Sequence, residues 1–189
     1  MKVMTYYMLL ASEDINEDRI VCLSNDDEDI NGYELCIGKE YKRWDGKFQF
    51  YYDQDQGSKE TDYLVNDMSW FLISEKLKAI LDEMNTTIQY LPVQIKEKNS
   101  LKELKGYYVA NILTVVNALC LRECTRGPGF GRLFRNIIKY AIYEKKVKGA
   151  DIFKLGKGEQ IPIVVSEKFK NCFEEHKLTG IDFLEIKVV

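Results

Sequence analysis

The sequence predicts an α+β fold: a mainly antiparallel sheet with two similar strand–helix–strand units that carry one amphipathic helix each. The main observation is an internal echo, in which residues 71–93 return as residues 163–186. The segment FLISEKLKAILDE (residues 71–83) returns as IVVSEKFKNCFEE (residues 163–175). The second copy then has one extra residue, after which IQYLPV (residues 88–93) returns as IDFLEI (residues 181–186). The rest of the chain consists of short apolar or β-branched runs between polar loops, which is typical of strands.

Residues 1–70 are predicted to form a β-rich, acidic amino-terminal part. Apolar or alternating runs predict its strands at residues 5–10, 19–23, 33–37 and 48–52. The run at residues 33–37 (YELCI) alternates apolar and polar side chains, as a half-buried strand does. No clean linker marks the end of this part, so the boundary near residue 70 is soft. Residues 71–189 form the α+β part that contains the echo.

The first unit begins with a short strand at residues 71–73, and its helix starts at Ser74. A serine hydroxyl at this position accepts a hydrogen bond from a free amide, and Glu75 suits the positive end of the helix dipole. One apolar stripe follows at helical spacing, made of Leu77, Ile80, Leu81 and Met84. Residues 88–95 return as a strand in which Pro92 predicts an edge position or a bulge.

The second unit follows the same logic. Its stripe consists of Phe169, Cys172, Phe173 and His176. Gly180 comes after the helix, and residues 181–189 alternate as a terminal strand. His176 takes the place of Met84, and a lone imidazole at the apolar edge of a helix predicts a structural role.

Between the two units, three apolar runs predict further strands. Residues 107–119 are β-rich and read as a central strand that leads into a turn, and residues 137–143 and 150–155 resume the sheet. The loop at residues 125–132 (TRGPGFGR) contains too much glycine and proline for regular structure.

Length and composition describe an ordinary globular protein. The 189 residues suit one sizeable domain or two small packed ones, and 46% of them are hydrophobic. No apolar stretch approaches the ~20 residues that span a bilayer, so we expect a soluble, cytoplasmic protein without a membrane partner. Five cysteines and one histidine do not form paired ligand clusters, which predicts free thiols, no metal and no cofactor.

The sequence offers no catalytic constellation. A nucleophilic triad would have to use the single histidine, and no nucleophile elbow is present. Acidic residues are plentiful, but none is isolated in an apolar context that would raise its pKa. We therefore expect no catalytic residues and no enzymatic activity.

Charge is spread unevenly. Residues 1–70 carry 16 acidic and 7 basic side chains, a net charge of −9, whereas residues 96–148 carry a net charge of +8. The glycine-rich loop in this basic segment suggests an alternative function, the binding of nucleic acid or a phosphate ligand through Arg122, Arg126, Arg132 and Arg135. The loop lacks the Gly-Lys-Ser/Thr ending of a phosphate loop, and the acidity of the whole chain argues against a nucleic-acid partner.

Several of these segments resemble an immunity-protein family of bacterial polymorphic toxin systems, the eleventh in its numbered series. The likeness is carried by residues 71–93, 107–119, 151–155 (DIFKL) and the closing stretch from residue 165 to Leu184. It covers roughly residues 65–189 and is looser around residues 38–44 (GKEYKRW). The loop at residues 122–135 departs from the family pattern.

The resemblance implies a protein that binds and neutralises a toxin domain encoded nearby, without catalysis of its own. It transfers no site residues. Immunity proteins against basic toxin domains often present acidic surfaces that steer association. Such a surface is predicted here from Asp26, Asp27, Glu28, Asp29, Asp53 and Asp55, with a merely solvated acidic loop as the alternative interpretation.

Overall fold

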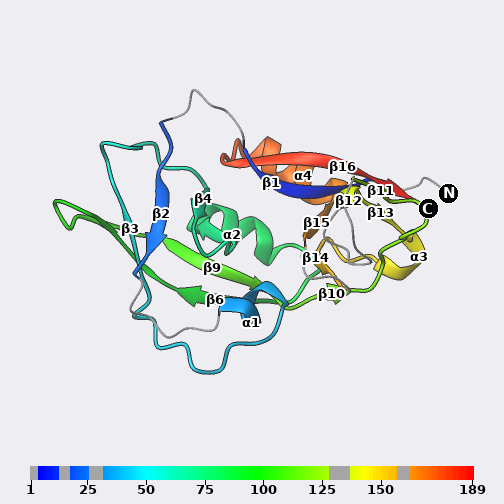
Figure 1. Ribbon diagram of the computed structural model, residues 1–189, viewed down its shortest axis with the longest axis horizontal. Helices are drawn as coiled ribbons and strands as arrows, with labels where there is room; N and C mark the ends of the chain where they lie inside the picture. Colours follow the sequence, from blue (N-terminus) through cyan, green and yellow to red (C-terminus); the bar gives the residue numbers. More distant parts are fainter. Residues whose placement is uncertain (1–3, 13–17, 26–31, 128–136, 157–161) are drawn as a thin grey trace.

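A computed structural model describes residues 4–12, 18–25, 32–127, 137–156 and 162–189 (Figure 1). Two curled sheets make up most of it, and most of their strand pairs are antiparallel, as predicted. Strands from both sides of residue 70 pair within each sheet, so neither part of the chain has a sheet to itself.

The larger sheet has eight strands. In spatial order they are β6 (Ile88–Pro92), β9 (Tyr107–Ile112), β5 (Leu72–Ser74), β4 (Tyr63–Asn66), β2 (Val21–Ser24), β3 (Gln49–Tyr52), β7 (Gln94–Glu97) and β8 (Glu103–Leu104). Pro92 ends the edge strand β6, as the sequence indicates, because an edge position does not need a second amide donor. The chain bends there and returns as β7 beside β3.

The smaller sheet has six strands, and a separate pair completes the β structure. The six are, in order, β10 (Val115–Val116), β14 (Ile152–Leu155), β15 (Ile163–Ser166), β1 (Tyr6–Ala11), β16 (Ile181–Val188) and β13 (Ala141–Ile142). The separate pair is β11 (Thr125–Arg126) with β12 (Ile137–Lys139).

The described residues contain four helices, which are α1 (Gly32–Cys36), α2 (Glu75–Asp82), α3 (Glu144–Val147) and α4 (Glu167–Glu175). The expected cap of α2 is confirmed, because the Leu77 amide donates to Ser74 Oγ at 3.2 Å. Ser166 caps α4 in the same way. His176 does not lie on a buried stripe but is exposed at the end of α4.

The strand predicted at residues 33–37 is wrong, because this segment forms α1. Five residues that alternate apolar and polar fit one helical turn as well as a short strand, and only Leu35 is buried. Gly38 follows in the left-handed conformation, at φ 74°, which glycine adopts without strain. A β-carbon on Gly38 would lie 2.7 Å from Val115 Cγ2, so the tight approach of α1 to β10 depends on this glycine.

The two longer helices pack together between the sheets (Figure 1). Their stripes form one shared core with inward side chains of both sheets, consisting of Phe71, Ile73, Leu77, Ile80, Leu81, Met84, Ala110, Ile112, Ile152, Val165, Phe169, Phe173, Leu178 and Ile181. A second core lies on the other face of the large sheet and is rich in aromatic rings, among them Phe48, Phe50 and Trp70. A third core packs under the small sheet around Tyr6 and Phe153.

Two aspartates connect each helix start to the end of the other helix. Asp151 accepts from the Ser166 hydroxyl at 2.8 Å and from the Asn85 amide, after α2, at 2.9 Å. Asp62 accepts from the Ser74 hydroxyl at 2.7 Å and from the Thr179 amide, after α4, at 2.9 Å. These reciprocal bonds fix the relative position of the two helices.

We predict that Asp151→Asn lowers the free energy of unfolding at pH 7 by about 1–3 kcal/mol, because buried hydrogen bonds to a charged group are lost. Burial raises the pKa of Asp151, but the hydrogen bonds from Asn85, Ser166 and Lys168 outweigh burial and lower it overall. Stability from this group is therefore present above the unfolded-state pKa of about 3.9 and is lost as the pH falls through the lower folded-state pKa.

The measurement is urea denaturation at several pH values between 7 and 2. Asp151→Asn should show a smaller loss of stability on acidification than the wild type. Glu40→Gln, at an exposed position, is the control and should follow the wild-type curve. A variant curve parallel to the wild type at every pH would contradict the assignment.

Candidate functional site

One face of the large sheet is covered over only part of its width. At β5 and β9 this face carries Ile73, Ala110 and Ile112, which belong to the shared core beside α2. The strand register continues the same face outward through β4, β2, β3 and β7, where none of the described helices covers it. We call these outer positions the open face, and they are Val21, Leu23, Gln49, Tyr51, Val65, Gln94 and Lys96.

The open face combines exposed apolar side chains with polar neighbours. Val21 is 49% exposed and lies opposite Val65, and Leu23 is 55% exposed and lies opposite Tyr51. The Tyr51 hydroxyl donates to Gln49 Oε1 at 2.8 Å, and Lys96 Nζ donates to the same oxygen at 3.3 Å. Apolar strand residues that point to solvent next to a tyrosine are typical of a surface that another protein covers.

Acidic residues border this face at both ends of β2 and β3. Asp18 precedes β2, and Asp67, after β4, accepts from the Ser24 amide at 2.9 Å. Asp53 and Asp55 of the predicted surface follow β3 directly, with Asp55 exposed and Asp53 half-buried. The Asp53 carboxylate accepts from the Asp55 amide at 3.0 Å, which holds the turn. The other four predicted acidic residues, Asp26, Asp27, Glu28 and Asp29, lie outside the described residues.

The aromatic residues of this region divide by burial. Tyr51 is half-exposed on the open face. Tyr52 and Trp70 are buried in the second core, and the half-buried Trp44 donates from Nε1 to the Pro92 carbonyl at 2.7 Å. Among these four aromatic residues, Tyr51 is therefore the one that lies on the open face, on the strand that Asp53 and Asp55 follow.

The basic residues of the alternative site are only partly described. Arg122 and Arg126 are exposed, and Arg126 lies in β11, which pairs with β12. Nearby, Lys187 forms an ion pair with Glu123. Arg132 and Arg135 lie outside the described residues, so convergence of the four arginines stays a prediction.

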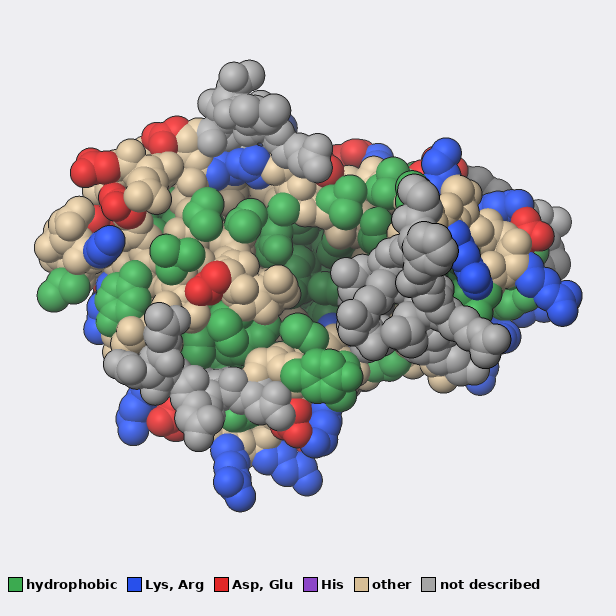
Figure 2. Space-filling view, in the orientation of Figure 1, with side chains coloured by type: hydrophobic (Ala, Val, Ile, Leu, Met, Phe, Trp, Pro, Cys, Tyr) green, Lys and Arg blue, Asp and Glu red, His purple; other side chains and the backbone are tan. Residues whose placement is uncertain are grey.

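A separate cleft opens between the two sheets (Figure 2). Its volume is about 500 Å³, and its walls come from β1, β9, the end of α1 and the segment before β5. The Asn66 side chain holds that last segment, because its Oδ1 accepts from the Trp70 amide at 3.0 Å and its Nδ2 donates to the Trp70 carbonyl at 2.8 Å. Leu9, Leu10 and Trp70 are among the lining residues, so the cleft is mainly apolar.

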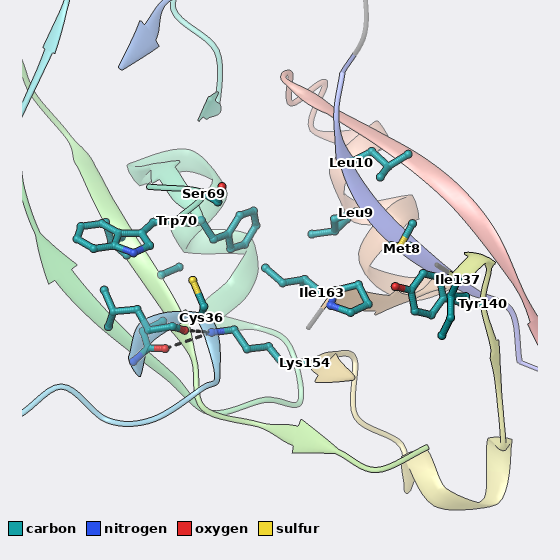
Figure 3. A pocket seen from close by; sticks show the side chains of 16 residues that line it. Met8, Leu9, Leu10, Cys36, Ser69, Trp70, Ile137, Tyr140, Lys154 and Ile163 are labelled. Carbon is teal, nitrogen blue, oxygen red and sulfur yellow. Dashed lines mark hydrogen bonds between the residues drawn. The ribbon is translucent and has the colours of Figure 1, made fainter. Parts of the chain in front are cut away.

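Lys154 lies at the base of this cleft (Figure 3). It extends from β14 toward α1 and is only 5% exposed. Its Nζ donates to the Leu35 carbonyl at the end of α1, and Asn111 Oδ1 lies 3.4 Å away. Burial lowers the pKa of Lys154 to about 8, and the nearby Cys36, which acts in the opposite direction, does not offset the lost hydration.

Reactive groups do not gather in the described part of the chain. The His176 ring lies against a main-chain oxygen, with Nδ1 2.8 Å from the Cys172 carbonyl oxygen. Burial, helped by Asp67, raises the pKa of the Cys22 thiol to about 12, which keeps it unreactive. Among the described residues, no three His, Cys, Asp or Glu side chains are grouped as metal ligands. No helix there is long and apolar enough to cross a membrane.

Sequence reasoning missed the open face and Lys154. Val21 and Leu23 flank the buried Cys22 in an unbroken apolar run, which does not show which side faces solvent. Lys154 sits in the otherwise apolar strand Ile152–Leu155, all of whose residues are buried. A lysine inside such a run is a detectable signal, since a charge there must be buried or break the strand.

Comparison with known proteins gives one finding. Residues 5–188 match the model of the Immunity protein family (Imm11), which covers nearly the whole chain. A search of the curated proteins finds no match.

We predict that Val21→Ser and Leu23→Ser each change the free energy of unfolding by less than about 0.5 kcal/mol, because these side chains are exposed. Leu64→Ala, on the buried face of the same sheet, should cost about 2–5 kcal/mol. Urea denaturation followed by circular dichroism measures all three. Strong destabilisation by the serine variants would mean that the open face is covered.

Proposed function

Because the chain belongs to the Imm11 immunity protein family, we propose that it binds and neutralises a cognate toxin domain encoded nearby. It acts in the cytoplasm and without catalysis, by covering the active site or the substrate path of the toxin. The match over residues 5–188 carries this proposal. The lack of a reactive cluster in the described residues is compatible with a binding role.

The proposed toxin-binding surface is the open face together with its acidic border. Val21 and Leu23 supply exposed apolar area, and Tyr51 supplies the kind of aromatic anchor that dominates many interfaces. Asp53 and Asp55 give the border a negative charge, and the acidic run Asp26-Asp27-Glu28-Asp29 follows β2 in the sequence. The fitting partner is a toxin domain with a basic surface, because opposite charges steer association and disfavour other partners.

The alternative function, nucleic-acid or phosphate binding by the loop at residues 122–135, stays a prediction. Phosphate recognition requires basic side chains on one face. Arg122 and Arg126 are exposed, and Lys187 nearby is engaged by Glu123. This pairing lowers the local positive charge and favours the toxin-binding proposal.

We further propose that the two strand–helix–strand units are an internal duplication. β5–α2–β6 pairs with β9, and β15–α4–β16 pairs with β1, in matching registers. Ser74 lies opposite Tyr107 as Ser166 lies opposite Tyr6, and a second tyrosine follows in both partner strands. In this arrangement the amino-terminal strand β1 completes the second unit, as β9 completes the first.

The first experiment is a rescue assay. The carboxy-terminal domain of the adjacent large open reading frame is expressed in a host cell with and without this protein. Toxicity that is relieved only when the protein is present, together with co-purification of the pair, is the expected result. Toxicity without rescue would contradict the proposed function.

We predict that the double variant Val21→Ser/Leu23→Ser binds the toxin domain at least about tenfold more weakly, which corresponds to about 1.4 kcal/mol. Asp53→Asn/Asp55→Asn, with or without neutralisation of residues 26–29, should slow association and reduce its dependence on salt. Surface plasmon resonance at two ionic strengths measures both effects.

Leu184→Ser, at a position 41% exposed on β16 of the small sheet, is the matched control and should bind like the wild type. Loss of binding in Leu184→Ser with unchanged binding in the open-face variants would place the interface on the small sheet.

A further inference from the structure

The cleft between the sheets has the size and the lining of a ligand site. A volume of about 500 Å³ lies within the range of small-molecule pockets, roughly 300–1,000 Å³. Its described walls are apolar over most of their area, and strands of both sheets contribute to them, among them β1 and β9. Figure 3 shows Met8, Leu9 and Trp70 around the space.

Lys154 is the one charged side chain among the described lining residues. Its Nζ has two protein acceptors, Leu35 O and Asn111 Oδ1, and both are neutral. An ammonium group has three N–H donors, so the acceptors in the described part of the chain leave one donor for a ligand. Within the described residues, no carboxylate forms an ion pair with Lys154. A buried ammonium group that has neutral acceptors and no paired carboxylate is stabilised by any anion that reaches it.

The arrangement also limits the charge of the ligand. The Asn111 Nδ2 amide already donates to the Lys39 carbonyl at 2.8 Å and to Gln89 Oε1 at 3.2 Å, so it adds no donor to the cleft. One ammonium group matches one carboxylate, whereas a phosphate dianion requires several donors or cations. The apolar walls then require an apolar body behind the carboxylate.

We propose that this cleft binds a small amphiphilic carboxylate, with the carboxylate on Lys154 Nζ and the apolar part along β1 and β9. The site is distinct from the open face and does not depend on the toxin. A single acidic side chain of a partner protein fills only a small part of this volume, which favours a separate ligand with an extended apolar part. Because the lowered pKa leaves Lys154 mostly protonated at neutral pH, the site is ready to accept an anion.

Decanoate is the probe, and decanol and decylammonium are its neutral and cationic analogues. Titration calorimetry with the full chain at pH 7 measures the three affinities. Decanoate should bind at least tenfold more tightly than decanol, and decylammonium more weakly than both. Decanoate affinity should fall as the pH rises through about 8, because the carboxylate binds the protonated lysine.

Variants then test the role of Lys154. Lys154→Met keeps an unbranched side chain as far as the ε position, removes the ammonium group and should abolish the preference for decanoate over decanol. Lys96→Met, on the open face, is the control and should keep the preference. Leu10→Trp narrows the cleft without changing its charge and should weaken the binding of both compounds.

Three results would overturn the proposal. Equal affinity of the wild type for decanoate and decanol would reduce the cleft to an unspecific apolar surface. An unchanged preference in Lys154→Met would place the anion elsewhere. A peptide that binds through its C-terminal carboxylate, while decanoate does not bind, would make a partner protein the occupant. The pH dependence is measured on the wild type, so a variant that fails to fold does not prevent a decision.

Discussion

The fold depends on the packing of α2 against α4 between the two sheets. Each helix is only about two turns long, so a single helix is too short to bury its own apolar stripe. Together with Ile73, Ile112 and Val165 they form one core that both sheets share. At about 25 cal/mol for each Å² of apolar surface removed from water, this burial is the main stabilising contribution. Separation of the two helices would expose both sheets.

The hydrogen bonds of Asp62 and Asp151 give this core a single geometry. Apolar packing alone tolerates small shifts of one helix along the other, whereas a carboxylate that bonds the start of one helix and the end of the other does not. Asp151 is buried, so the loss of its partners would cost the full desolvation of a charge. Gly180 allows the matching approach near Asp62, because a β-carbon there would lie 2.5 Å from the Tyr63 carbonyl.

Both candidate sites follow from the limited reach of this helix pair. The eight-stranded sheet is wider than the two helices cover, which leaves the open face on β2, β3 and β7. The cleft lies between the two sheets, with β1 of the small sheet and β9 of the large sheet among its walls. Lys154 joins the two sheets there by its bonds to α1 and β9. The same lysine therefore stabilises the fold and gives the cleft its charge.

The sequence by itself determined much of the local structure: the echo, the Ser74 cap, the apolar stripe of α2 and the stripe of α4 except for His176. These features depend on residues close in the chain, whose spacing carries the information. The family resemblance also rested on such core segments, and the match over residues 5–188 confirms it. Only the tertiary structure decided that residues 32–36 form α1, that β1 pairs with β15 and β16, and that Val21 and Leu23 face solvent. It also placed Lys154 in a cleft. Each of these depends on contacts between distant segments, and a linear pattern does not specify which face of a strand a distant helix will cover.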